Sequence, residues 1–128
     1  MHSTRIDLSA KARTRMTGVL NARLADALDL QLQAKQAHWN VKGPSFIALH
    51  ELFDRIAGET AAHVDDIAER ITALGGVAEG TVQAVAGRTR LELTTEDMSP
   101  HDDTTEGPEG AVIAGLTNEV LLKALTEL

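Results

Sequence analysis

Two pairs of potential metal ligands lie in the middle of the chain, each spaced by one helical turn. His50 and Asp54 form the first pair, and Asp65 and Glu69 form the second. Residues at positions i and i+4 of a helix share a face, so each pair can direct two donor atoms at one point. The sequence has no cysteine, so a metal would be held by imidazole and carboxylate groups, which suit iron, manganese or zinc. Each pair is therefore half of a candidate metal site.

Any one of these side chains also has a plainer explanation. A single histidine on a helix is more often packed or hydrogen-bonded than metal-bound, and acidic residues four positions apart are usually solvated. The metal hypothesis rests on the set, because His38 also falls on the inward face of the preceding helical segment. Three further histidines are expected to be ordinary structural or exposed residues: His2, His63 and His101.

The first segment that must position these residues has the pattern of a long helix. Asp7 or Ser9 can cap its start, because a short polar side chain accepts a hydrogen bond from the free backbone amides there. Apolar residues and His38 follow at steps of three or four. We expect this helix to reach about Asn40, with Gly43 and Pro44 ending it.

A second helix is expected from Ser45 to about Leu74, where Gly75 and Gly76 permit a helix stop. Its ordinary core stripe consists of Phe46, Leu49, Phe53, Ile56, Val64, Ile67, Ile71 and Leu74. Beside the stripe lies a second face made of His50, Asp54, Ala57, Gly58, Ala61, Asp65 and Glu69. The small residues at the centre of this second face would let another helix approach closely.

The two ligand pairs are too far apart on one straight helix to hold the same ion. At about 1.5 Å of rise per residue, Asp54 and Asp65 are about 16 Å apart along the axis, and His50 and Glu69 about 28 Å. Two copies packed antiparallel about an axis near Gly58 would bring the first pair of each copy to the second pair of the other. The site is therefore predicted to lie between two subunits.

The 128 residues are enough for one domain with its own core, and an aromatic content of only 2% favours helices over strands. We expect an all-α bundle of long antiparallel helices, with a short tail at 1–8 and a long connection at 77–110 that has room for one short helix. A third substantial helix is expected at 111–128. The pattern predicts no fourth helix.

The net charge and the hydropathy of the chain limit the kinds of partner that it can bind. The net charge of −7 opposes binding to nucleic acid through the body of the protein. Arg5, Lys11, Arg13 and Arg15 are either a short DNA-contacting arm or the solvated first turns of a helix, and we favour the second interpretation. No segment approaches the ~20 apolar residues of a membrane span, and no signal peptide is evident. We expect a cytoplasmic protein with weak DNA binding at most.

Three stretches carry a family resemblance. Residues 36–44 read QAHWNVKGP, residues 46–54 read FIALHELFD, and HVDDIAER at 63–70 is followed by LGG at 74–76. Together they resemble the Dps family, and the likeness covers about residues 5–90. The resemblance implies a ferritin-like four-helix subunit, a hollow shell of twelve subunits, oxidation of Fe(II), usually by hydrogen peroxide, and storage of the ferric product. Some members also condense DNA.

The same motifs imply the roles of individual residues. The implied iron ligands are His38, His50 and Asp54 from one subunit and Asp65 and Glu69 from its two-fold partner, with Trp39 beside the iron. After about Arg90 the sequence departs from the family, and the fourth helix is expected to be missing. We therefore expect the isolated chain to form dimers or ill-defined assemblies more readily than a uniform shell.

Two other functions fit the residues. One is a non-catalytic protein that compacts DNA or forms another oligomer, with structural histidines and carboxylates. The other is a zinc or manganese binder without redox turnover, since those metals accept the same donors. A conventional di-iron site within one subunit is disfavoured, because the chain contains no Glu-x-x-His motif.

Overall fold

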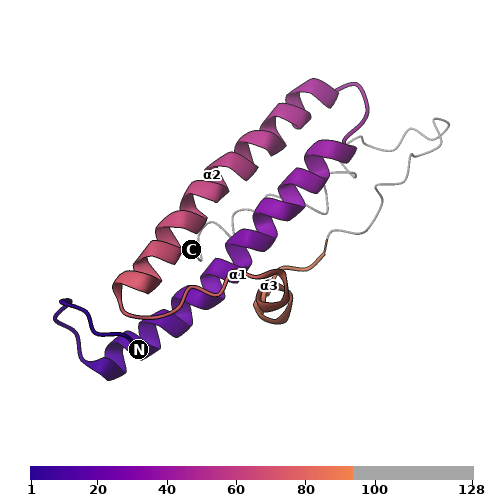
Figure 1. The fold of residues 1–128 in the computed structure, drawn as a ribbon. Helices are drawn as coiled ribbons and strands as arrows, with labels where there is room; N and C mark the ends of the chain where they lie inside the picture. The colour runs from indigo at the N-terminus through magenta and orange to yellow at the C-terminus, as the bar shows by residue number, and fades with distance from the viewer. Residues whose placement is uncertain (94–128) are drawn as a thin grey trace.

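Two long helices lie side by side in the computed structural model, which describes residues 1–93. Helix α1 spans Ala10–Asn40 and helix α2 spans Phe46–Ala73, and a short turn joins them (Figure 1). They run antiparallel, since the end of α1 meets the start of α2. A third helix, α3, spans Val82–Arg88 and packs against α1. Residues 1–93 contain no strand, so the all-α prediction is confirmed; the helix predicted at 111–128 lies outside the described residues.

Ser9 is the residue that caps the start of α1. Its backbone is extended, and its hydroxyl accepts a hydrogen bond from the amide of Ala12 at 3.2 Å. This satisfies one of the free amides of the first turn. At the other end, Val41 is extended and Gly43 has φ 106°, a backbone angle that suits glycine. The predicted bounds of the first helix are therefore correct, and of the two predicted caps Ser9 is the one used.

Helix α2 ends in a Schellman motif built on two glycines. The amide of Gly75 donates to the carbonyl of Thr72 at 2.9 Å, and the amide of Gly76 donates to that of Ile71 at 3.0 Å. Gly75 has φ 85°, the left-handed conformation that this motif requires. At the start of α2, Ser45 occupies the N-cap position but its side chain makes no capping hydrogen bond within the described part of the chain.

The first residues of the chain are held against the end of α2. The amide of His2 donates to the carbonyl of Gly75 at 2.7 Å, and the hydroxyl of Thr4 donates to that of Ala73 at 2.9 Å. Arg13 donates to the carbonyl of His2 at 3.2 Å. The tail expected at residues 1–8 is thus non-helical and docked.

The core between α1 and α2 includes a cluster near the connecting turn. Ala37, Val41 and Phe53 are buried there, and Leu49 and Ile56 pack against them. Farther along, the largest fully buried side chains are Leu24, Leu30, Thr60 and Ile71. The core stripe predicted for the second helix is buried or half-buried at its middle and end. Phe46, the first residue of α2, is instead 37% exposed.

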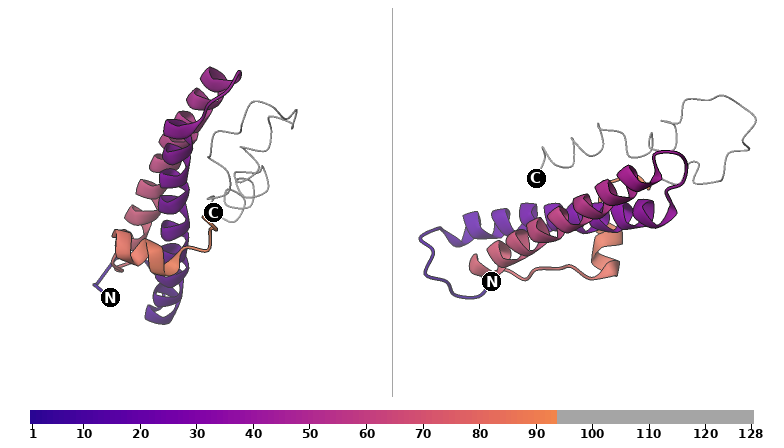
Figure 2. Two further views of the ribbon diagram at one scale, coloured as in Figure 1. Left: turned by 90° about the vertical axis from the view of Figure 1, so that its right-hand side faces the viewer. Right: turned by 90° about the horizontal axis from the view of Figure 1, so that it is seen from above.

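Helix α3 lies across α1 (Figure 2) and is followed by a segment tied to a buried carboxylate. Asp26 is 4% exposed. It accepts hydrogen bonds from the backbone amide of Arg90 at 2.9 Å and from the Arg90 guanidinium at 3.1 Å. A buried carboxylate needs such partners, because desolvation is costly without them. The short helix expected within 77–110 is present as α3, and Thr89, Arg90 and Glu92 after it form hydrogen bonds with side chains of α1.

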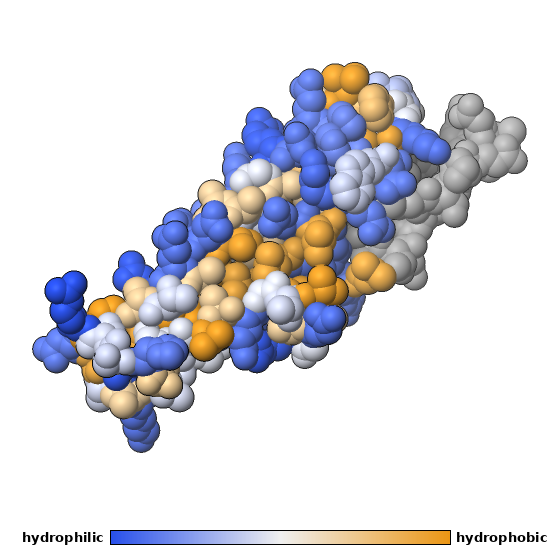
Figure 3. Space-filling model, viewed as in Figure 1, coloured by the Kyte–Doolittle hydropathy of each residue, from blue (hydrophilic) through white to orange (hydrophobic). Residues whose placement is uncertain are grey.

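The surface of the described residues has both apolar and polar areas. Figure 3 shows apolar residues along the middle of one face, bordered by polar ones. Exposed large apolar side chains include Leu32, Trp39 and Ile47. Within residues 1–93, no helix is long and apolar enough to cross a membrane.

Candidate metal site

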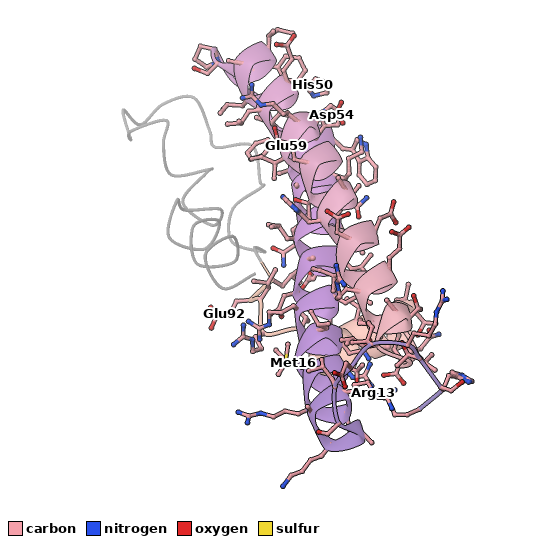
Figure 4. All side chains as sticks on the ribbon, turned by 90° about the vertical axis from the view of Figure 1, so that its left-hand side faces the viewer. Arg13, Met16, His50, Asp54, Glu59 and Glu92 are labelled. Carbon is pink, nitrogen blue, oxygen red and sulfur yellow. The ribbon has the colours of Figure 1, made fainter. Side chains whose placement is uncertain are left out.

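The turn between α1 and α2 brings two of the predicted ligands into contact. His38 lies in the last turns of α1 and His50 in the second turn of α2. Their imidazole rings stack with centroids 3.7 Å apart and an interplanar angle of 21°. His50 and Asp54 lie together near one end of the helix pair, far from Arg13 at the other end (Figure 4). Two helices that meet at a tight turn thus supply one end of the site.

The backbone carbonyl of each histidine fixes the tautomer of the other histidine's ring. The Nδ1 atom of His38 lies 2.7 Å from the carbonyl oxygen of His50, and the Nδ1 atom of His50 lies 2.8 Å from the carbonyl oxygen of His38. A carbonyl oxygen only accepts, so both Nδ1 atoms carry the proton and donate it. In the neutral imidazole this leaves the Nε2 lone pair free on both rings. That is the tautomer of a metal-binding histidine whose second nitrogen donates to a backbone carbonyl.

Apolar neighbours hold this pair of rings in place. The ring of Phe46 lies 4.9 Å from that of His50, on a tilted plane. The buried cluster of Ala37, Val41 and Phe53 lies near the same turn between α1 and α2. Both histidines are half-buried, so their orientation is set by packing as well as by hydrogen bonds.

Asp54 lies one turn beyond His50 and pairs with a lysine of α1. The Nζ atom of Lys35 is 2.7 Å from Oδ1 of Asp54. The hydrogen bond and positive charge of Lys35 lower the pKa of the Asp54 carboxyl, and His38 and His50 lower it further by smaller amounts. The side chain of Asp54 is 55% exposed. It is an accessible, ionised carboxylate beside two imidazoles.

The other predicted ligands lie farther along α2. Asp65 and Glu69 are exposed, and about 16 Å of helix axis separates Asp65 from Asp54. Among residues 1–93, no three histidine, aspartate or glutamate side chains of one chain form a group able to hold a metal ion. Trp39, predicted to lie beside the iron, is 68% exposed. Within the described residues, one chain therefore stacks the rings of His38 and His50 with Asp54 one turn along α2, but it assembles no set of three donors and leaves the second pair farther away.

The space beside Gly58, between the two ligand pairs, is open. A Cβ atom added to Gly58 would meet no atom within 4 Å, leaving aside the helix's own nearby backbone. Ala57 is buried and Ala61 is half-buried. Gly58 therefore leaves room beside α2, but Ala57, which the sequence pattern placed on the same face, is packed within the chain.

Lys35 is the one residue of this neighbourhood that sequence reasoning missed. It precedes His38 by three positions, a spacing that places both on adjacent turns of one helix face. That spacing was the available signal. Its pairing with Asp54, 19 residues away, depends on how the two helices pack.

The comparisons with known proteins agree with this fold. The sequence model of the ferritin-like domain matches residues 18–120. The DNA protection during starvation protein of Agrobacterium fabrum is 47% identical over 97 residues, which cover 76% of this chain and 60% of that protein. Among the first relatives of this kind the chain spans about half to three fifths of their length.

Solved structures give the same result. DpsA14 from Streptomyces coelicolor has a TM-score of 0.81 at 34% identity, covering 97% of this chain and 68% of that one. Mycobacterium smegmatis Dps, in a tetragonal form, has a TM-score of 0.82 at 28% identity, covering 98% and 70%. The fold is therefore that of a ferritin-like protein. Within that class, the chain belongs to the Dps family.

Proposed function

We propose that this protein oxidises Fe(II) at a site shared by two subunits and stores the ferric product. The observation that carries the proposal is the pair of histidines with free Nε2 atoms, stacked beside the ionised Asp54. Three donors at one end of the helix pair are suited to a divalent cation that arrives from solution. Iron is here the substrate and the cargo.

The donor set fits iron chemically. Neutral imidazole binds the ferrous ion, and carboxylates stabilise the ferric ion relative to the ferrous one. The predicted set of two histidines and three carboxylates supplies both kinds of donor, whereas thiolates are absent because the chain has no cysteine. In metal-binding histidines, the ring nitrogen that does not bind the metal usually donates a hydrogen bond, often to a backbone carbonyl.

The missing donors would come from a second copy of the chain. Asp65 and Glu69 are exposed on α2, and the open space beside Gly58 leaves room for another α2 helix. An isologous pair of antiparallel α2 helices would place each aspartate–glutamate pair opposite the histidines of the other copy, giving two equivalent sites.

We propose hydrogen peroxide as the oxidant. Each of two ferrous ions gives up one electron, and the two electrons break the O–O bond of peroxide. With two protons the products are two ferric ions and two waters. This reaction removes both reactants that produce hydroxyl radicals. It would protect DNA without contact, in keeping with the name of the relatives, DNA protection during starvation proteins.

Stopped-flow absorbance tests the proposal. Anaerobic protein loaded with Fe(II) should consume peroxide and lose Fe(II) faster than iron in buffer. His50→Ala should slow the reaction by at least about tenfold, since one lost ligand costs a metal site about that much or more. His63→Ala is the matched control, because His63 is an exposed histidine of the same helix.

A second matched pair isolates the carboxylates. Asp65→Asn should slow the oxidation, whereas Asp66→Asn, one position along the same exposed stretch, should not. Equal rates with and without protein, or equal rates for all four variants and the parent, would refute ferroxidase activity. Metal binding without oxidation would instead indicate a zinc or manganese protein.

A further inference from the structure

Residues 81–92 contain α3 and the segment after it, and polar side chains fasten them to α1. The residues of α1 that do so share one face of the helix and follow at steps of three and four: Asp26, Asp29 and Gln33. The hydroxyl of Thr89 donates to Asp29 at 2.6 Å, and the amide of Arg90 donates to Asp26 at 2.9 Å. Gln33 donates to the carbonyl of Glu92 at 3.2 Å, and Figure 4 shows Glu92 beside α1. Three successive side chains of α1 thus hold one segment.

Apolar packing contributes little to this attachment. Val85 is the buried residue of α3, whereas Val82 is 74% exposed. Among residues 1–93, α3 packs against α1 and not against α2. The ion pair between Arg88 and Glu79 lies at the surface, where such pairs contribute little to stability. Hydrogen bonds to α1 are therefore the main attachment of residues 81–92.

Hydrogen bonds of this kind are easier to open than an apolar core. A hydrogen bond that is exchanged for one to water loses little free energy, and water can solvate the carboxylates and the amide group of α1 once they are uncovered. Unfolding of the two long helices would instead expose apolar side chains such as Phe53 and Ile71, which are 4% and 0% exposed. Detachment of residues 81–92 is thus a smaller step than unfolding.

Asn21 and Gly80 mark the point at which the detached segment would turn. The side-chain amide of Asn21 donates to the carbonyl of Val77 at 3.0 Å, and its oxygen accepts from the amide of Glu79 at 2.9 Å. These two bonds clamp the chain to α1 just before Gly80. Gly80 is exposed, and glycine permits large changes in its backbone angles. The chain can therefore turn at Gly80 while residues 77–79 stay attached.

We propose that residues 81–92 form a flap, which opens from α1 as one unit while α1 and α2 stay folded together. Opening of the flap uncovers Asp26 and Gln33, which are buried when it is closed. Local opening of this kind needs less free energy than global unfolding. The flap is a conformational device that covers or exposes one side of α1 without unfolding the helix pair.

Hydrogen exchange of the full-length protein, measured by NMR at low urea concentrations, tests the proposal. The amides of Val85, Thr89 and Arg90 should share one opening equilibrium, because they belong to the same flap. Their opening should be at least about a hundredfold more favourable than that of the Phe53 and Thr60 amides in α2, which need global unfolding.

Two substitutions weaken the attachment of the flap. Asp26→Asn should increase flap opening about tenfold, because it removes the negative charge to which Arg90 donates. Thr89→Val removes the bond to Asp29 but leaves the buried Asp26 intact, and it should increase opening about threefold. The second variant keeps the test available if the first does not fold.

Ile71→Val is the matched control. It weakens the core of the closed and the open protein alike, so it should accelerate exchange of the Phe53 amide and leave the flap amides unchanged. If the flap amides exchange no faster than those of α2, or respond to Ile71→Val as those do, the flap opens only by global unfolding and the proposal is wrong. Unchanged flap opening in Thr89→Val and in folded Asp26→Asn would also overturn it.

Discussion

At the scale of single residues, the main feature is the mutual dependence of His38 and His50. Each ring donates its Nδ1 proton to the backbone carbonyl of the other residue. Loss of either ring would leave the backbone bond in one direction only and would remove the stacked neighbour at 3.7 Å. The two histidines therefore act as a unit, and their single replacements are expected to be non-additive.

The first prediction concerns the pKa of Asp54 in the metal-free protein. Lys35→Met should raise it towards the ordinary value of about 3.9 for aspartate, because the hydrogen bond and charge of Lys35 are the largest causes of its lowering. A pH titration of the Asp54 carboxyl carbon by NMR measures the change. Lys11→Met should leave the pKa of Asp54 unchanged.

The sign of the accompanying change in stability follows from the direction in which the pKa of Asp54 is shifted. A carboxyl whose pKa is lowered in the folded state stabilises the protein above its unfolded pKa, and this contribution is lost as the pH falls through the folded value. The parent should therefore lose slightly more stability than Lys35→Met over that acidic range. An Asp54 pKa that does not respond to Lys35→Met would contradict the assignment of its cause.

At the scale of helices and turns, the end of α2 and the first residues of the chain depend on each other. Gly75 ends α2 in the left-handed conformation. A Cβ atom built on Gly75 would lie only 2.4 Å from the carbonyl oxygen of His2. The turn and the docked tail thus require glycine for two independent reasons, the backbone angle and the close approach.

Gly75→Ala is predicted to destabilise the protein and to release the first residues. The left-handed backbone alone should cost about 1–2 kcal/mol, and contact with His2 would displace the tail. Urea denaturation measures the loss of stability. Hydrogen exchange of the His2 amide, which donates to Gly75, measures the release of the first residues.

Gly87→Ala is the control for this substitution. Gly87 lies within α3, and an added Cβ there would meet no atom within 4 Å. It should stabilise the protein or leave it unchanged, since alanine has the higher helix propensity. If Gly75→Ala denatures at the same urea concentration as the parent, alanine does not strain the backbone at position 75 and the prediction is wrong.

At the scale of the whole molecule, the proposed iron site would be divided between two copies of the chain. His38 and His50 stack at the end of the helix pair where Asp54 also lies, and Asp65 and Glu69 lie exposed farther along α2. A two-fold dimer would join unlike halves from different copies. Complementation between two inactive chains tests this arrangement directly.

His38→Ala and Asp65→Ala are each predicted to lose ferroxidase activity. Unfolded together and refolded, they should form mixed dimers in which one of the two shared sites has all its ligands. Such a mixture should recover about a quarter of the parent activity, because about half of randomly paired dimers are mixed and each has one of two sites intact. Native mass spectrometry counts the mixed dimers. If these form and activity does not return, the site is not shared.

DNA binding is predicted to be weak. The net charge is −7, and Arg13 donates hydrogen bonds to the backbone carbonyls of His2 and Leu74. This leaves Arg5, Lys11 and Arg15 as the exposed cations near the first helix. Gel retardation should therefore fade steeply as salt is added. A complex that persists at several hundred millimolar salt, on the order of a few times physiological strength, would contradict the electrostatic argument.

The sequence by itself determined the bounds of the two long helices and singled out the candidate ligand pairs on them. Ser9 and Gly75 mark the start of α1 and the end of α2 as expected, because helix caps and stops are local signals within a few residues. The separation of Asp54 from Asp65 also follows from the rise of one helix. These features need no knowledge of tertiary packing.

Only the tertiary structure decided which side chains meet across the helices. The reciprocal bonds of His38 and His50 and the pairing of Lys35 with Asp54 depend on how α1 and α2 are rotated against each other. Periodicity gives the face of each helix but not that relative rotation. The anchoring of Arg90 on the buried Asp26, 64 residues away, was likewise not readable from the sequence. Contacts between distant residues are set by packing of the whole chain, which no local pattern encodes.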